Sequence, residues 1–448
     1  MKFFKKEYFI TAAGIFIFLQ SILTAAPDSL YVDNEYFIVD SIKISGNDIT
    51  EEYIILRELT FKSSDVVSTS DLRYNRERIF SLRLFTRVDL KTEASSDQDK
   101  KNVIIDLAES WYIYPIPFIR RNNEASGKYS FGVNLSFKNF RGRNEHLRSV
   151  ISLGYDPYFA LLYQNPAFDF KNNLGISFGL SFLKLSNKSE YAKTIYGGDF
   201  EYKFYSIGFS LGKRIDQFNE LYGTAGFDYI EGPEESKGRI TASGRPIDRV
   251  LSLKVNYDYD SRDLKQFSQN GIFSSVSLKH NGFGINSISY NVFEFDFREY
   301  RSIISDLSAR WRFAFRHTFG GFIPYYDYSY FGYGEYVRGY SNDNHEGNNS
   351  IIASVEMSYP LIKEFDFSIK IPLIPQQLTS ARIGIYLSAF ADAGQVFNNN
   401  HRFRFSDFYP GYGFGLTILV LPYNALRLEY AFNKYGIGEI LIGTGFSF

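Results

Sequence analysis

The stretch LSLKVNYDYD at residues 251–260 alternates without exception between apolar or aromatic residues and polar ones. Successive side chains of a β-strand point to opposite faces, so this pattern predicts a strand with one apolar wall and one polar wall. The same period of two recurs at residues 293–298, 307–316 and 426–430. From about residue 128 to the end of the chain, the alternation therefore predicts a unit built mostly of β-strands.

Two all-β architectures fit this alternation, and they place the apolar wall differently. A soluble sandwich turns its apolar faces inward, whereas a membrane barrel turns them outward to the lipid. Aromatic residues make up 18% of the chain, with 45 Phe and 35 Tyr. The outer wall and the interfacial girdles of a membrane barrel require many aromatic side chains. We therefore predict a transmembrane antiparallel β-barrel over residues 111–448.

The predicted barrel contains about sixteen strand-like segments. An even number lets an antiparallel barrel bring its first and last strands together, which removes exposed edges. A long interruption, from about residue 316 to 350, falls between the eleventh and twelfth segments. The segments begin near residues 128, 146, 159, 173, 194, 205, 219, 249, 271, 287, 305, 351, 382, 411, 425 and 439.

The N-terminus predicts export. Lys2, Lys5 and Lys6 precede a largely apolar run from Tyr8 to Leu23, and Thr24-Ala25-Ala26 supplies small residues for cleavage. This order of basic, apolar and small residues is typical of a secretory signal. We predict a signal peptide over residues 1–26 and a short linker over residues 27–35.

Residue composition excludes several kinds of site. The chain has no cysteine, which excludes disulfides, thiolate metal sites and lipoprotein attachment. Its formal net charge of −1 gives no electrostatic reason to expect a nucleic-acid partner. The loop that carries Asp343, His345 and Glu346 lacks the spacing of a metal site. We expect no metal and no cofactor.

One short motif is shared with serine hydrolases. Residues 175–179, Gly-Ile-Ser-Phe-Gly, spell the nucleophile elbow, which needs a strand, a sharp turn and a helix to expose its serine. Here the motif lies inside an alternating segment with no histidine nearby in the sequence. We interpret it as small residues on a barrel strand and expect that the protein is not an enzyme. A membrane hydrolase stays the alternative, and it requires Ser177 to react with an active-site serine probe.

A different unit precedes the barrel, over residues 36–110. Its pattern predicts a β-α-α-β-β order, with turn residues Gly46 and Asn47 after the first strand and Thr50 as a helix cap. The predicted elements are a strand at Tyr36–Ile44, helices at Thr50–Leu59 and Ser70–Leu82, and a hairpin of Phe85–Lys91 with Val103–Leu107.

Two motifs in the barrel region carry a family resemblance. Val337, Arg338, Gly339 and Tyr340 lie in the long interruption, and Phe390-Ala391-Asp392-Ala393-Gly394 follows about fifty residues later. These motifs resemble the loop-six signature and the Phe-x-Asp-x-Gly strand motif of the BamA/TamA family of outer-membrane barrels. The resemblance implies that the loop folds into the lumen, where Arg338 pairs with Asp392 and with Glu356 as a second acid.

The N-terminal unit and the last strand extend this resemblance. Residues 36–110 look like one POTRA (polypeptide-transport-associated) domain, and the landmarks for this are Ile44-Ser45-Gly46-Asn47, Arg78, Leu84-Phe85, Val88 and Glu109. Phe446 and Phe448, on one face of the last strand, resemble the C-terminal signal read by the outer-membrane assembly machinery.

The resemblance also implies a seam in the barrel, where the first strand meets the last one. We expect the first strand at about residues 127–137, with Phe131 at the seam. Gly443 and Gly445 lie on the opposing strand, and glycine weakens strand packing, which favours a labile seam.

The function implied by the resemblance is that of an insertase or translocase. It places the barrel in a bacterial outer membrane, with the POTRA domain in the periplasm. The implied partners are unfolded outer-membrane or secreted polypeptides, the lipid bilayer, and periplasmic chaperones or accessory subunits. The alternative is a passive channel or a surface barrel without insertase activity.

Overall fold

The computed structural model describes residues 35–445 except 98, 124–127, 235–237, 305, 332–336, 342, 344 and 401–403. The predicted signal peptide, residues 27–34 of the predicted linker, Phe446 and Phe448 lie outside the described residues. In the described part of the chain, no helix is both long enough and apolar enough to cross a membrane.

The N-terminal unit is a four-stranded sheet covered by two helices. Strands β1 and β4 run parallel at its centre, and the sheet order is β2-β1-β4-β3. Helix α3 begins with a capping box, in which Ser68 and Asp71 each bind the other's backbone N–H. The elements are β1 (Tyr36–Ser45), α2 (Glu52–Leu56), β2 (Val66–Ser68), α3 (Thr69–Phe80), β3 (Phe85–Ala94) and β4 (Lys100–Glu109). The first helix is shorter than predicted, and the short strand β2 was not predicted.

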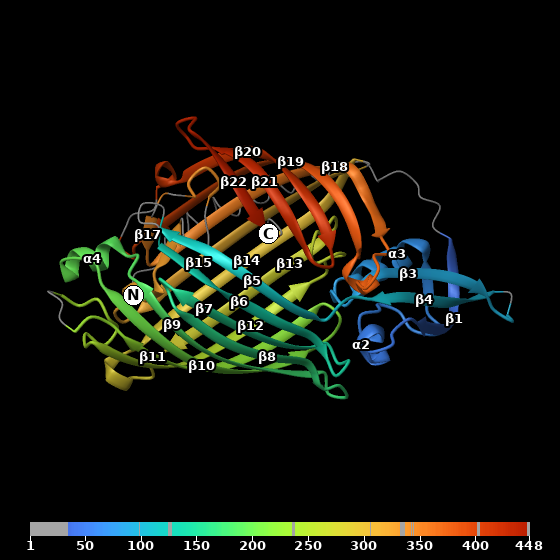
Figure 1. Ribbon diagram of the computed structural model, residues 1–448, viewed down its shortest axis with the longest axis horizontal. Coiled ribbons are helices and arrows are strands. Elements are labelled where there is room, and N and C mark those ends of the chain that lie inside the picture. Colours follow the sequence, from blue (N-terminus) through green and yellow to red (C-terminus); the bar gives the residue numbers. More distant parts are fainter. Residues whose placement is uncertain are drawn as a thin grey trace, which may run out of the picture.

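The rest of the chain forms one antiparallel sheet of sixteen strands that curves into a barrel (Figure 1). The barrel strands are β5 (Ile113–Asn123), β6 (Lys128–Phe140), β7 (Glu145–Gly154), β8 (Tyr158–Asp169), β9 (Leu174–Ser186), β10 (Glu201–Arg214), β11 (Asn219–Glu231), β12 (Ile247–Asp260), β13 (Gly271–Asn281), β14 (Tyr290–Ile304), β15 (Leu307–Gly320), β18 (Asn349–Ser368), β19 (Ser380–Phe397), β20 (Tyr409–Leu421), β21 (Asn424–Phe432) and β22 (Gly438–Thr444). The loop between β15 and β18 carries the short hairpin of β16 (Ser329–Phe331) and β17 (His345–Gly347). The predicted fold class is therefore confirmed.

The barrel wall is apolar outside and polar inside, as the alternation predicts. On β12, the side chains of Leu251, Leu253, Val255 and Tyr257 are exposed. The opposite face of the same strand carries Lys254, whose ammonium lies 2.9 Å from a carboxylate oxygen of Glu294 on β14. Outward apolar residues match the requirement for a surface in contact with lipid.

The predicted strand count was right through two compensating errors. Strand β5 was missed, because Pro115 and Pro117 interrupt its pattern. The segment predicted near residue 194 is helix α4 (Glu190–Tyr196), which is capped by Ser189 and ended by Gly197 in the left-handed conformation. Because the first predicted strand, near residue 128, is β6 and not β5, a different strand lies at the seam.

The N-terminal unit packs against the turns at one end of the barrel (Figure 1). The ion pair between Glu77 on α3 and Arg382 on β19 has a separation of 2.7 Å. The Arg83 guanidinium donates to the carbonyls of Pro422 and Tyr423 in the turn before β21, at 3.2 and 2.5 Å. These contacts, together with those described below for Glu58, fix the orientation of the POTRA-like unit relative to the barrel.

Candidate functional site

Arg338 lies in the barrel lumen at the centre of a buried ionic cluster. Its Nε and Nη2 donate to the two carboxylate oxygens of Asp392 on β19, at 2.7 and 2.8 Å. Its Nη1 donates to Glu356 on β18 at 2.8 Å and to Glu429 on β21 at 2.9 Å. The guanidinium also stacks on the ring of Phe390, 3.5 Å from its centroid. All four charged side chains are at most 6% exposed.

Glycines make room for the loop at this point. An added Cβ at Gly394 would lie 2.7 Å from Cγ2 of Val337, and one at Gly411 would lie 1.8 Å from the carbonyl oxygen of Arg338. Gly339 has φ +99°, a conformation that side chains other than glycine rarely adopt. Gly339 and Gly394 of the two sequence motifs, together with Gly411 of β20, therefore allow the loop backbone to lie directly on β19 and β20.

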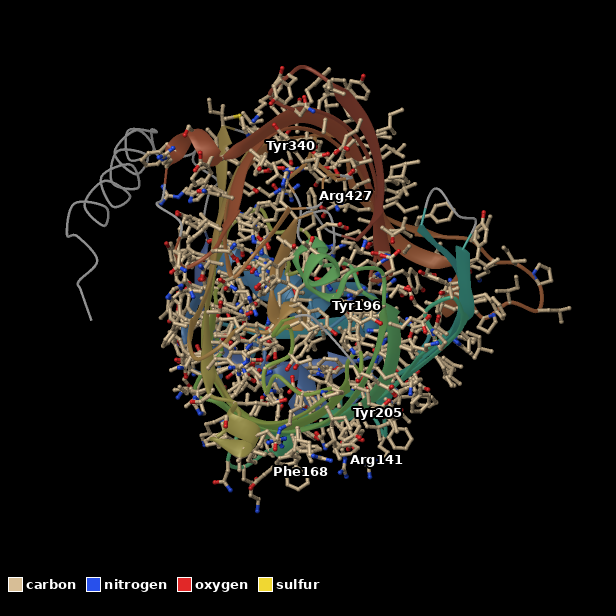
Figure 2. All side chains as sticks on the ribbon, turned by 90° about the vertical axis from the view of Figure 1, so that its left-hand side faces the viewer. Arg141, Phe168, Tyr196, Tyr205, Tyr340 and Arg427 are labelled. Atoms are coloured by element: carbon tan, nitrogen blue, oxygen red, sulfur yellow. The ribbon has the colours of Figure 1, made fainter. Side chains whose placement is uncertain are left out.

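The same loop is bound to the last strand. The carboxylate of Glu439 on β22 accepts hydrogen bonds from the backbone N–H of Gly339 at 2.7 Å and from Oγ of Ser341 at 2.7 Å. Oη of Tyr340 accepts a hydrogen bond from the N–H of Lys434, in the turn before β22, at 2.9 Å. In the view along the barrel, Tyr340 and Arg427 lie inside the ring of strands (Figure 2).

The structure brings Arg338 together with both predicted acids, and it adds residues that were not predicted. Glu429 and Glu439 are the two further carboxylates that bind the loop. Arg310 on β15 pairs with Glu356 and supplies a second cation to the cluster. The alternation on β21 and β22 indicates that both acids face the lumen, but it does not indicate which lumen residues meet the loop.

The two ends of the sheet are β5 and β22, and the described residues show no pairing between them. The prediction that Phe131 lies at the seam was wrong. Phe131 is on β6, where it pairs with Ile119 of β5, so one whole strand separates it from the edge. Gly443 and Gly445 do lie at the end of β22, where Gly445 has φ +118° and an added Cβ at Gly443 would lie 3.2 Å from Nη2 of Arg427.

The edge of β5 lacks two hydrogen-bond donors. The N–H of Lys138 donates to the carbonyl of Tyr112 at 2.8 Å, and this pair is in line with the register of β5 and β6. Alternate residues of an antiparallel strand bind the same neighbour. Residues 114, 116 and 118 therefore bind β6, whereas residues 113, 115, 117 and 119 direct their backbone groups toward the seam. Two of these four are Pro115 and Pro117, which have no N–H.

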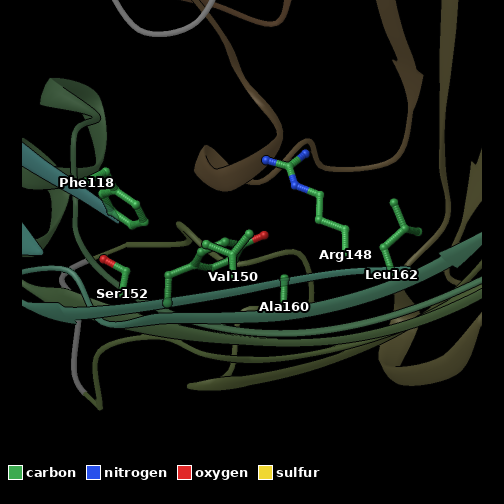
Figure 3. A pocket seen from close by; sticks show the side chains of 7 residues that line it. Phe118, Arg148, Val150, Ser152, Ala160 and Leu162 are labelled. Carbon is green, nitrogen blue, oxygen red and sulfur yellow. The ribbon is translucent and has the colours of Figure 1, made fainter. Parts of the chain in front are cut away.

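A cavity opens on the lumen side of the wall near this edge. Its volume is about 240 Å³, and most of its lining is apolar, from β5, β7 and β8. Phe118, Val150, Ala160 and Leu162 line it beside the guanidinium of Arg148 (Figure 3). The first strands therefore offer an apolar surface inside a lumen that is otherwise rich in charged side chains.

Two further sequence candidates are Ser177 and the loop residue His345. Ser177 lies in the middle of β9, where its register partners are Gln164 and Ser210, and no sharp turn exposes it. The imidazole of His345 stacks on the ring of Tyr409 at 4.1 Å. Across the described residues, no group of three or more histidine and acidic side chains is arranged to hold a metal ion.

Comparison with known proteins matches both units. The model of the Omp85 superfamily domain matches residues 139–448, and the POTRA model, described as a surface antigen variable number repeat, matches residues 37–110. A putative outer membrane protein assembly factor of Treponema pallidum (strain Nichols) is 23% identical over 311 residues, covering 66% of this chain and 34% of that protein. The chain thus spans about a third of the length of this curated relative.

Solved structures share the fold. BamA from Haemophilus ducreyi lacking POTRA domains 1–3 has a TM-score of 0.53 and 18% identity, with 99% of this chain and 93% of that chain covered. CdiB from Escherichia coli has a TM-score of 0.55 and 11% identity, with 91% of this chain and 74% of that chain covered.

Proposed function

The chain belongs to the Omp85 superfamily, and from this premise we propose that it inserts or translocates polypeptide clients by opening its barrel between β5 and β22. The resemblance drawn from the loop and strand motifs is confirmed, and the chain is an outer-membrane protein with a periplasmic POTRA domain. Its family assembles or translocates polypeptides in that membrane. We also propose the domain boundaries, which are 36–110 for the POTRA domain and 111–448 for the barrel. The route through the barrel and the nature of the client are proposed as well.

The observation that carries the proposal is the unsatisfied edge of β5. Backbone groups cannot stay unpaired in lipid, so an incoming strand needs a template edge. With Pro115 and Pro117 facing the seam, β5 and β22 cannot form a continuous ladder, and the seam costs less to open than any other strand pair. The carbonyls along the same edge stay available to accept hydrogen bonds from a client strand.

The lumen loop has a positioning role in this proposal. The contacts described for residues 337–341 all go to the β18–β22 side of the seam. The loop therefore holds the last strand from inside, while β5 is free to separate from it. The apolar cavity beside β5 would receive the side chains of a client strand on its lumen face.

The POTRA domain supplies a second edge for clients. Strand β3 is at the end of its sheet, and its residues Lys91 to Ala94 are exposed. Extended peptides bind such edges by adding a strand. We propose that β3 captures an unfolded client in the periplasm and delivers it to the seam.

An engineered disulfide tests whether the barrel opens between β5 and β22. The chain has no native cysteine, so no other disulfide can form within it. Paired cysteines at Ile119 of β5 and Ile440 of β22, both on the lipid face, lock the seam. The matched control pairs Ile119 with Phe131, which joins β5 to β6 and leaves the seam free. In proteoliposomes with an unfolded barrel client, the locked protein is expected to lose insertion and to regain it on reduction, whereas the control keeps it.

The result that overturns the proposal is full client insertion by the oxidised Ile119–Ile440 protein. Neighbouring pairs on the lumen face, such as Ile116 with Gly443, repeat the test at a second position of the same edge. Disulfide formation is quantified by gel mobility before each assay, so an unlocked fraction is not mistaken for activity.

A further inference from the structure

A charged cavity lies between the POTRA helices and the barrel turns. Its volume is about 200 Å³, and it is bounded by residues in and next to α2 and α3 and by strands and turns of the barrel between β6 and β13. Six charged residues line it: Arg57, Glu58, Arg78, Arg214, Glu220 and Lys265. Four of the six are cations, so the lining carries two more positive than negative charges.

Both acids of the cavity already interact with arginine side chains. Glu58 accepts hydrogen bonds from Arg78 at 3.1 Å and from Arg214 at 2.6 and 3.2 Å. Burial raises the pKa of Glu58, but the charge and hydrogen bonds of Arg214 outweigh burial, and the net pKa lies below the ordinary value. Glu220 lies 3.9 Å from Nε of Arg214. Neither carboxylate is therefore free to neutralise another cation.

Two buried arginine atoms of this cavity lack a hydrogen-bond partner. They are Nε of Arg57 and Nη1 of Arg78, and the Arg78 residue is only 1% exposed. In the described part of the chain, Nη1 of Arg57 donates to the carbonyl of Pro166 at 3.1 Å, and no carboxylate forms an ion pair with this guanidinium. Buried guanidinium donors without an acceptor are costly, because they lose their hydration without replacement.

The position of the cavity is at the membrane-facing rim of the barrel. The ring of Tyr53 on α2 packs on Phe170 in the turn after β8, with ring centroids 4.6 Å apart. Phe168 and Phe170 are 61% and 50% exposed, and in Figure 2 Phe168 lies on the outside of the barrel. Exposed aromatic residues at the end of a barrel strand mark the level of the lipid headgroups.

We propose that this cavity binds a phosphate group, carried by a phospholipid headgroup or free in solution. Guanidinium groups match phosphate with charge-assisted hydrogen bonds, and here they come from both the POTRA domain and the barrel. A phosphate between Arg57 and Arg78 satisfies the two unpartnered donors, and it lies beside Lys265, whose ammonium also pairs with Asp260 at 3.3 Å. A phosphate bound here holds the POTRA domain against the end of the barrel. This role goes beyond the proposed function and does not depend on opening of the seam.

Native mass spectrometry of the full chain in a neutral detergent tests the site, with inorganic phosphate and phosphatidylglycerol as separate probes. Arg57→Gln removes a cation that has no acidic partner, and it leaves the hydrogen bonds of Glu58 with Arg78 and Arg214 intact. The matched control is Arg73→Gln, an exposed arginine on α3. Loss of a hydrogen-bonded charge is expected to weaken binding by about tenfold or more, whereas the control keeps wild-type affinity.

Either probe supports the proposal when Arg57→Gln selectively weakens its binding. Binding of phosphatidylglycerol without binding of inorganic phosphate assigns the site to a headgroup, and equal binding of both assigns it to the phosphate group itself. No saturable binding of either probe, or equal weakening by Arg57→Gln and Arg73→Gln, overturns the proposal. Lys265→Gln is the second variant, and it must weaken the same probe, because its ammonium lines the same cavity.

Discussion

Arg338 is the residue on which the arrangement of the lumen loop depends. Its guanidinium is hydrogen-bonded to Asp392, Glu356 and Glu429, and Arg310 shares one of these acids. Two parallel hydrogen bonds to Asp392 fix the angle of the side chain, which a lysine ammonium cannot do. The cluster thereby joins one loop residue to three strands of the wall.

We predict that Arg338→Ala releases the loop and leaves the barrel folded. Removing one partner of a buried ionic cluster costs roughly 3–5 kcal/mol, less where lumen water screens the acids left behind. The sixteen-stranded ladder does not depend on this cluster, so the cost falls on the loop. Limited proteolysis of the loop should become faster and client insertion should fall, while the heat-modified gel mobility of the barrel stays the same. Unchanged proteolysis together with unchanged growth would contradict this role.

At the scale of a single element, strand β5 explains both a failed prediction and a proposed property. Because proline rarely occurs inside a sheet, the two prolines explain why the sequence pattern did not predict this strand. At the free edge, however, proline is tolerated, since the missing N–H would not meet a neighbouring strand. The residue type that obscured the element in the sequence is thus the one that identifies it as an edge.

We predict that replacing Pro115 and Pro117 with valine tightens the seam. Each substitution restores an N–H toward β22, and a hydrogen bond contributes about 0.5–1.5 kcal/mol. The double variant should unfold at a higher temperature and insert clients more slowly. Pro372→Val, in the exposed turn after β18, is the control for the general effect of losing a proline. Faster insertion by the double variant would argue against a labile seam.

The turn between β12 and β13 is an element whose stability should depend on pH. Burial raises the pKa of Asp263 to about 6, although its carboxylate accepts backbone N–H groups of Leu264, Gln269 and Asn270. A carboxyl whose pKa is raised by folding contributes stability below its unfolded pKa of about 4. That contribution is lost as the pH rises through about 6.

We therefore predict that this turn opens more readily at pH 7 than at pH 5. Hydrogen exchange of residues 264–270, corrected for the intrinsic rate at each pH, measures the opening. The turn of β10–β11 at residues 215–218 is an internal reference, since Asp216 has a pKa below its ordinary value, set by backbone and side-chain hydrogen bonds that outweigh burial. Equal protection of residues 264–270 at both pH values would refute the prediction.

Much of the candidate site followed from the sequence, and the rest depended on contacts between distant strands. Residues 337–340 and 390–394 predicted the loop and its partner strand through their resemblance to the two motifs of the BamA/TamA family. Glu429 and Glu439 were not predicted, because many charged side chains face the lumen and only the folded loop selects among them. Phe131 was placed at the seam because β5 was missed, so that β6 was counted as the first strand of the barrel.

At the scale of the whole molecule, the function is tested in the cell. Depletion of the protein followed by quantification of the outer-membrane proteome should show loss of its clients. Joint loss of many barrels indicates a general insertase, and loss of a few exported proteins indicates a dedicated translocator. An unchanged proteome favours a passive channel or a surface barrel, and Arg338→Ala in the same assay separates loss of activity from loss of the protein.

The prolines of β5 also bear on what happens between molecules. A barrel with an open edge carries a hazard, because two copies in the same membrane can join edge to edge and form a continuous sheet. Two β5 edges would place Pro115 and Pro117 against each other, where neither side donates a hydrogen bond at these positions. The β5 edge is thus a poor template for a second β5 edge. A different polypeptide that donates its own N–H groups can still pair with it. The prolines therefore disfavour association of neighbouring barrels while the seam stays accessible to other chains.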